Sequence, residues 1–368
     1  MTGMKSRGSH LFLPLSVLAI LIVINLIKGA NYFSISIING ALYGNIPNIL
    51  YGASELVILA IGMTIVTSSA GSQDLSVGVA ATITSAVFVW VLLSAGGITW
   101  WTILVAFLVS CVVGIVIGSF NGALVAALNV QPIVATLIVF TVGRSIAFLI
   151  DGKLSPILAS NLTYQIGNAI PGIPVRTPII LTVIFVALFA VLLKTTNLKL
   201  YSQAVGINQK AARLNGINPV KIKFLAFMIM GVCTAVAGFI AVTKAGRHDS
   251  YNLLRNIEMD AILAVAIGGN SLYGGKFSIT GTIIGAYTIE VLDQTLLRLD
   301  VPTQAINAFK AVFIIILMVI ASPAVREFAG NGTNWVRARL GGAVRIQTAT
   351  GDDAVAVPRS DISAKKEE

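Results

Sequence analysis

The chain has 368 residues, of which 56% are hydrophobic and only 11% charged, against about 25% charged residues in an ordinary soluble domain. This composition excludes an ordinary soluble enzyme, a disordered protein and a disulfide-rich secreted scaffold. The net charge of +10 would suggest nucleic-acid binding in a soluble protein, but membrane proteins also retain Lys and Arg on their cytoplasmic side. The apolar residues form long blocks rather than the alternating strands of an outer-membrane barrel. We therefore expect an all-α polytopic membrane protein.

Ten apolar blocks are candidates to cross the hydrocarbon core of a bilayer, which is about 30 Å thick. The first follows Lys5 and Arg7, as in a signal peptide, but no small-residue cleavage site comes after it, so we expect an uncleaved helix. Together they predict a transmembrane domain over residues 11–323 with about ten helices. The blocks are 11–27, 49–67, 76–94, 102–128, 133–150, 178–194, 224–243, 260–275, 279–297 and 305–321.

Basic residues predict the orientation. The segment 194–223 carries six of them and no acid, so the positive-inside rule places it in the cytoplasm. With ten spans, residues 1–10 and 324–368 are also cytoplasmic, while loops 28–48 and 151–177 lie outside. The tail 324–368 has too little apolar material to fold alone, and we expect it to be disordered.

A polar turn, Ala70-Gly-Ser-Gln-Asp-Leu-Ser-Val-Gly78, separates the second and third blocks. Asp74 precedes Ser76 in a pattern typical of a helix N-terminus, where an acid and a hydroxyl stabilise the free N–H groups. The functional alternative is that this turn belongs to a gate on the cytoplasmic side.

Glycine recurs every fourth residue in the fourth block, at Gly114, Gly118 and Gly122. This spacing leaves one smooth helix face, which allows another helix backbone to approach closely. Asn121 lies on the neighbouring face, where an amide surrounded by lipid must find a partner or line water.

The fifth block begins at Pro132, since proline is tolerated in a first helical turn, and Thr136 follows one turn later. Arg144 lies about a dozen residues into this block, where a charge must pair, snorkel to the interface or face an aqueous cavity. Glu55 in the second block raises the same question. For both charges, a functional role and a structural ion pair stay open.

The basic segment between the sixth and seventh blocks contains a short predicted helix over Gln209–Leu214. Asn208 is a suitable N-cap, and Gly216 followed by Pro219 would end the helix. This helix is either a solvated connector or a docking element, and two small residues on it, Ala211 and Ala212, are expected to be exposed.

Glycine pairs flank a polar stretch in the eighth block, Gly268-Gly-Asn-Ser-Leu-Tyr-Gly-Gly275. No Gly-Lys-Ser/Thr follows, so the stretch is not a nucleotide-binding Walker loop. In a membrane protein, such glycine-rich backbone is tolerated as a re-entrant or kinked segment inside the protein or beside a cavity.

Together these stretches resemble the permease subunits of bacterial ATP-binding-cassette importers for monosaccharides, of the ribose, xylose, arabinose and galactofuranose type. The resemblance covers roughly residues 45–320, and its last segment is the most specific and looks similar to galactofuranose-type permeases. One departure is the turn: such permeases usually have Gly-Gly-Ile before the aspartate, whereas Ala70-Gly-Ser-Gln73 precedes Asp74 here, so the turn is expected to be one residue longer. The matching segments are Leu59-Ala-Ile-Gly-Met-Thr-Ile-Val, Asp74-Leu-Ser-Val-Gly, Asn121-Gly-Ala-Leu-Val, Gln131-Pro-Ile-Val-Ala-Thr-Leu, Ala204-Val-Gly-Ile-Asn…Ala-Ala-Arg-Leu-Asn-Gly-Ile and Met259-Asp-Ala-Ile-Leu-Ala-Val-Ala-Ile-Gly-Gly-Asn-Ser-Leu-Tyr-Gly-Gly.

The resemblance implies a division of labour. A periplasmic sugar-binding protein delivers the monosaccharide, two permease subunits (identical or paralogous) form the path, and a separate cytoplasmic ABC ATPase supplies the energy. The chain is then not an enzyme, needs no cofactor or metal, binds no nucleic acid and lies in the bacterial inner membrane with both termini in the cytoplasm. The rival hypothesis is a stand-alone transporter driven by H⁺ or Na⁺, for which Glu55 and Arg144 are the obvious coupling residues.

The resemblance and the polar interruptions together predict two sets of site residues. Amides and hydroxyls suit a weak passage for sugar hydroxyls better than charges do, but a purely structural role stays open for Asn121 and Asn270. The ATPase-coupling set consists of Gly206, Asn208, Ala211, Ala212 and Gly216. The path or gate set consists of Asp74, Asn121, Thr136, Gly268, Gly269, Asn270, Ser271, Gly274 and Gly275.

Overall fold

The computed structural model describes residues 9–28, 34–38, 41–152 and 155–321. It divides into two units, Met1–Ala311 and Val312–Glu368. Of the second unit, only the helical residues up to 321 are described. The expected tail 324–368 and most of the expected N-terminal segment 1–10 therefore lie outside the described residues.

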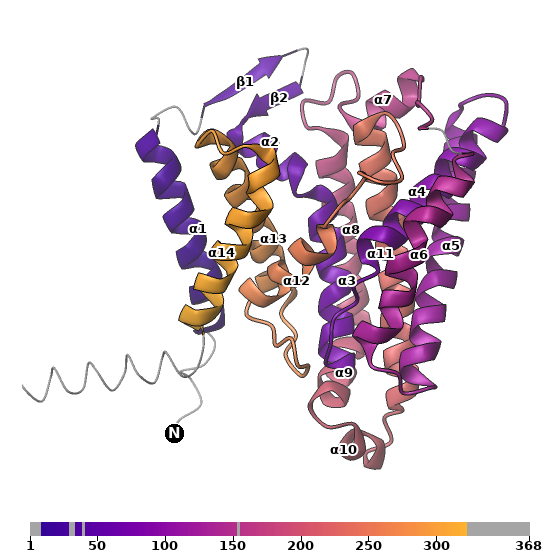
Figure 1. Ribbon diagram of the computed structural model, residues 1–368, viewed down its shortest axis with the longest axis vertical. Coiled ribbons are helices and arrows are strands. Elements are labelled where there is room, and N and C mark those ends of the chain that lie inside the picture. The colour runs from indigo at the N-terminus through magenta and orange to yellow at the C-terminus, as the bar shows by residue number, and fades with distance from the viewer. Residues whose placement is uncertain (1–8, 29–33, 39–40, 153–154, 322–368) are drawn as a thin grey trace, which may run out of the picture. The chain divides into compact units, whose positions relative to one another are not determined.

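Helices dominate the first unit (Figure 1). One antiparallel hairpin, β1 (Ile35–Ile38) with β2 (Ala41–Gly44), departs from the all-α expectation. The helices are α1 (Ser9–Lys28), α2 (Asn45–Gly52), α3 (Ser54–Ala70), α4 (Val77–Ser94), α5 (Trp100–Ala126), α6 (Pro132–Ile150), α7 (Asn161–Gly167), α8 (Thr177–Thr195), α9 (Leu198–Ile207), α10 (Gln209–Leu214), α11 (Pro219–Ala245), α12 (Ile257–Ile267), α13 (Ile279–Arg298) and α14 (Thr303–Ala321).

Within the described ranges, five helices are long and apolar enough to cross a membrane: α4, α5, α6, α8 and α11. The bent pair α2 and α3, with 45° between its two helices, makes a sixth if it is counted as one span. An integral membrane protein follows from these lengths, since about 20 apolar helical residues span the hydrocarbon core. The count of ten spans and the breaks at glycine stay predictions.

Helix α3 lies at the centre of the packing. All of its residues from Ser54 to Ser69 are buried, and it contacts α8, α9, α11, α12 and α13. Apolar residues lie on every side of this helix, which is typical of a helix that is surrounded by protein rather than one that has a water-facing stripe.

The glycine stripe of α5 packs against α11. A β-carbon added at Gly114 would lie 2.2 Å from the carbonyl oxygen of Gly231, and one added at Gly118 would lie 2.2 Å from that of Phe227. Side chains larger than hydrogen would therefore separate the two helices. The structure confirms the interpretation of this stripe as a packing face.

The expected eighth span, 260–275, is not a continuous helix. Helix α12 covers only Ile257–Ile267 and ends at Gly268; its 11 residues rise about 17 Å, roughly half of the hydrocarbon core. Apolar composition alone does not distinguish such a short buried helix from a spanning one, so the block 260–275 was wrong as a single span, although its glycine pairs had indicated a kinked segment.

Both charges that were questioned in the apolar blocks have partners inside the protein. Arg144 Nη1 donates to the carbonyl oxygens of Ser250 at 3.1 Å, Tyr251 at 3.1 Å and Leu253 at 3.3 Å, in the loop before α12. The ammonium group of Lys244 lies 2.8 Å from the Glu55 carboxylate. The structural ion pair that was left open is thus present for Glu55, whereas the described partners of Arg144 are backbone carbonyl groups.

Candidate translocation and coupling site

Helix α10 forms as the sequence predicts. Asn208 Oδ1 accepts a hydrogen bond of 3.0 Å from the Ala211 N–H, which caps the helix. Gly216 has a φ of +80°, a conformation that glycine adopts without steric cost, and the next helix begins at Pro219. Figure 1 shows α10 at one end of the helix bundle, with β1, β2 and α7 at the other.

The two alanines of α10 differ in exposure, so the expectation that both are exposed is wrong for Ala212. Ala211 is exposed, but Ala212 is only 4% exposed. Adjacent residues of a helix point about 100° apart, so they do not both face outward when the helix packs on α9 and α11. Two exposed apolar residues at this end of the molecule were not predicted from the sequence: Ile207 is 74% exposed and Leu214 is 89% exposed.

A polar depression of about 420 Å³ lies beside α10, between that helix and the beginning of α11. Lys210 and Arg213 contribute positive charge to its wall, and Gly216 and Asn129 also line it. Exposed apolar side chains thus lie beside a basic depression at this end of the molecule.

Gly206 belongs to α9 rather than to α10, and it is the point where α9 meets the rest of the site. A β-carbon there would lie 1.8 Å from the carbonyl oxygen of Ser68 on α3 and 2.7 Å from the backbone nitrogen of Gly275. The Gly275 N–H in turn donates to that Ser68 oxygen at 3.1 Å. The coupling set and the path set are therefore in direct contact.

The segment after α12 is irregular backbone held close to other backbone. Gly269, Gly274 and Gly275 have φ values of +80°, +93° and +81°, which disfavour residues with a β-carbon. A β-carbon at Gly268 would lie 2.6 Å from backbone atoms of Gly281 in α13. These glycines allow the segment to fold back against α3, α9 and α13.

Asn270 closes this segment onto the beginning of α13. Its Oδ1 accepts from the Ser278 N–H at 2.6 Å, and its Nδ2 donates to the Ser278 carbonyl at 3.2 Å and to Thr282 Oγ1 at 2.9 Å. Ser271 makes a local turn instead, where its hydroxyl accepts from the Tyr273 N–H at 3.2 Å.

The other three path residues gather at the turn between α3 and α4. Asp74 Oδ1 accepts from the N–H and the hydroxyl of Ser76 at 2.8 and 2.6 Å. Asn121 Nδ2 donates to the same hydroxyl at 2.9 Å, and Thr136 Oγ1 accepts from the Leu75 N–H at 3.1 Å. Burial raises the pKa of the Asp74 carboxyl to about 6, although both hydrogen bonds from Ser76 act to lower it.

The helix-cap interpretation of this turn is wrong in one respect. Ser76 holds the N-cap position of α4, but its backbone is already helical and its side chain makes no cap hydrogen bond. The hydroxyl is instead shared between Asp74 and Asn121. Asn121 Oδ1 is buried and has no hydrogen-bond partner in the described part of the chain, so one acceptor remains available here.

The two clusters of path residues lie close to each other. Gln73 Nε2 donates to the Leu272 carbonyl at 3.2 Å, which joins the turn to the glycine segment. Thr64 and Thr282 share a hydrogen bond of 2.7 Å between their hydroxyls, which joins α3 to α13. The sequence-predicted path residues are thus brought to one region around the end of α3.

Two polar groups were missed by the sequence analysis. Lys310 lies 3.0 Å from the Asp260 carboxylate and 2.7 Å from the Asp293 carboxylate. The presence of these three charges inside apolar blocks was the sequence signal that could have predicted this ion-pair cluster. His248 Nδ1 lies 2.6 Å from Asp151 Oδ2, in a pairing across 97 positions that has no local sequence signal.

The long, apolar helices define an integral membrane protein whose polar groups meet at glycine-rich backbone. The chain belongs to the family described as the branched-chain amino acid transport system / permease component, whose family model matches residues 45–322.

Three relatives are named as sugar permeases. The fructose import permease protein FruF of Bifidobacterium longum is 38% identical over 297 residues, which cover 79% of this chain and 81% of that protein. The galactofuranose transporter permease protein YtfT of Escherichia coli K12 is 33% identical, over 84% of this chain and 88% of that protein. The ribose import permease protein RbsC of Haemophilus influenzae is 35% identical, over 85% and 94%. No solved structure matches the chain significantly.

Family membership confirms the prediction that the chain is the permease of an ATP-binding-cassette importer, and it disfavours the rival hypothesis of an ion-coupled transporter. A permease component is not itself catalytic, because ATP hydrolysis belongs to a separate ATPase subunit. A cytoplasmic ATPase and a substrate-binding protein follow as partners from the same membership.

Proposed function

We propose that this chain and a second permease subunit, a copy or a paralogue, form the path by which a monosaccharide enters a bacterium across its inner membrane. The fructose, galactofuranose and ribose permeases among its relatives support the substrate class. The observation that carries the mechanism is the contact of Gly206 with Ser68 and Gly275, because it connects the docking end of the molecule to the polar path residues.

The ATPase would hold α10 through the exposed Leu214 and the basic wall formed by Lys210 and Arg213. Coupling requires a contact that differs between two conformational states. A shift of α10 moves α9, and α9 transmits the shift through Gly206 to α3 and to the segment 268–275. The nucleotide state of the ATPase thereby changes the position of the gate.

The path itself would be lined by amide and hydroxyl groups around the end of α3. Asn121 Oδ1, which is buried without a partner among the described residues, would accept a hydrogen bond from a sugar hydroxyl. Asp74, Thr136 and Asn270 are buried in the described conformation. The proposal therefore requires the 268–275 segment to move before these groups contact sugar.

The orientation is the first testable part of the proposal. We place α10 and both termini in the cytoplasm, because the segment 194–223 is basic and has no acid. In a chain without Cys111 and Cys233, a membrane-impermeant thiol reagent added from outside should label Asn161→Cys on α7 and should not label Asn208→Cys. Both positions are exposed at opposite ends of the bundle.

Permeabilised cells supply the control, since both cysteines should then react. Labelling of Asn208→Cys in intact cells, with Asn161→Cys protected, would reverse the orientation and remove the basis for ATPase docking on α10.

The docking function is tested by Gly216→Val. No described atom lies within 4 Å of the added β-carbon, and φ is +80°, so the substitution acts through the backbone, at a cost of about 1–2 kcal/mol. We expect an inserted, folded protein that has lost sugar uptake and co-purifies less ATPase.

Gly172→Val is the matched control. Gly172 has a φ of +90° and also has no described atom within 4 Å of its added β-carbon, but it lies before α8 and outside the docking end. Uptake should persist in this variant. Normal uptake by Gly216→Val would reject the docking helix, and equal loss in both variants would assign the effect to backbone strain.

A further inference from the structure

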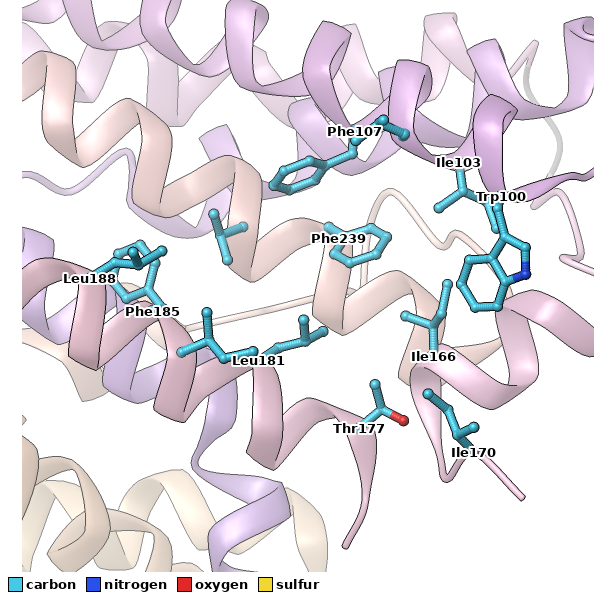
Figure 2. A pocket seen from close by; sticks show the side chains of 13 residues that line it. Trp100, Ile103, Phe107, Ile166, Ile170, Thr177, Leu181, Phe185, Leu188 and Phe239 are labelled. Carbon is cyan, nitrogen blue, oxygen red and sulfur yellow. The ribbon is translucent and has the colours of Figure 1, made fainter. Parts of the chain in front are cut away.

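An apolar groove of about 570 Å³ lies between α5, α7, α8 and α11 (Figure 2). Phe107 and Phe239 lie along its middle, and Leu181 and Phe185 form the α8 wall. Thr177 is the only lining residue with a hydroxyl, and this hydroxyl already donates to the Gln165 carbonyl at 2.8 Å. The groove therefore offers hydrocarbon contact and almost no polar recognition.

The groove lies at membrane depth. Three of the helices that form it, α5, α8 and α11, are candidate spans. On α8 it extends from Thr177 to Leu188, a rise of about 17 Å, which is close to the ~15 Å of one leaflet's hydrocarbon. Trp100 lies at the same end as Thr177 (Figure 2), and tryptophan is typical of the boundary between hydrocarbon and headgroups.

The lining does not suit a second helix. Helices pack closely in membranes through small residues, and this chain follows that rule where Gly114 and Gly118 meet α11. By contrast, the described lining residues of the groove include no glycine, alanine or serine. Large branched and aromatic side chains leave a narrow space, which suits a thin and flexible hydrocarbon.

We propose that this groove is a binding site for one acyl chain of a phospholipid, taken from the leaflet on the α7 side. Helix α8 packs on α2, α3 and α7, and the groove separates it from α5 and α11. The bound chain fills that space and holds α8 in place. Because α8 leads into α9 and α10, the lipid also supports the coupling end, a consequence that rests on the proposed function.

Native mass spectrometry of the permease, purified with its ATPase in mild detergent, tests the site. The unmodified protein should retain one phospholipid per permease. Val236→Trp, which fills the groove from α11, should lose it. Val112→Trp is the matched control, because Val112 is 59% exposed on α5 and does not line the groove; this variant should keep the lipid.

Leu181→Trp fills the groove from α8 and provides a second variant if Val236→Trp fails to fold. A phospholipid with a photoreactive group in its acyl chain should label the α8 and α11 walls of the unmodified protein, and this labelling should fall in both groove variants. Lipid retained by both groove variants, or absent from the unmodified protein, would overturn the proposal. So would loss of permease dimers with unchanged lipid, which would make the groove an interface between copies.

Discussion

Replacing Gly206 with valine should abolish sugar uptake and lower the thermal stability of the permease. A β-carbon at this position would lie 1.8 Å from the Ser68 carbonyl oxygen and 2.7 Å from the Gly275 nitrogen, closer than the 3.0 Å limit of real contacts. Both neighbours are backbone atoms, which cannot rotate away as a side chain could. The variant must therefore move α9 off α3, at a cost of about 1–3 kcal/mol or more.

Gly97→Val provides the control for this experiment, since Gly97 has no described atom within 4 Å of its added β-carbon and lies in the loop before α5. Uptake of labelled sugar and melting temperature should be unchanged there. Gly206→Ala brings the same β-carbon against Ser68 and Gly275 but lacks the two γ-methyl groups of valine, so it should disturb the fold less than Gly206→Val does. We expect it to insert and to retain ATPase while transport falls. Normal transport by Gly206→Val would show that the contact between α9 and α3 does not carry coupling.

Local signals in the sequence were sufficient for much of the fold. The blocks that became α4, α5, α6, α8 and α11 were found because a spanning helix needs a continuous apolar run. Helix α10 was found because its cap depends on residues a few positions apart, Asn208 and Gly216. The β1–β2 hairpin was missed, since it has no distinct strand pattern, and the apolar block 260–275 was drawn as one span although its own glycine pairs indicated a kinked segment from Gly268.

The arrangement of the site depended on contacts that sequence order conceals. Arg144 donates to carbonyl groups more than 100 positions away in the sequence, and Gly206 contacts Ser68, which is also far from it in the sequence. Composition indicated that Arg144 needed a partner but not which one. In the same way, Asn121 and Asn270 were both recognised as polar groups at membrane depth, whereas only their hydrogen bonds distinguish their roles.

Those hydrogen bonds predict different outcomes for Asn270→Leu and Asn121→Leu. Leucine at 270 removes the acceptor of the Ser278 N–H and the donor to Thr282. A buried polar group left unpaired costs about 1–3 kcal/mol, so this variant should lose both thermal stability and uptake.

Leucine at 121 removes one donor to the Ser76 hydroxyl, which keeps its hydrogen bond to Asp74. It also removes the Asn121 Oδ1 acceptor, which has no partner among the described residues. Asn121→Leu should therefore melt within a few degrees of the unmodified protein and still bind the ATPase, yet lose uptake, because the path loses its free acceptor. Asn161→Leu is the matched control, because Asn161 is an exposed residue of α7, and it should change neither property. The measurements are melting temperature, ATPase co-purification and uptake of labelled sugar for all three variants. A destabilised Asn121→Leu would assign Asn121 a structural role, and normal uptake by a stable Asn121→Leu would remove it from the path.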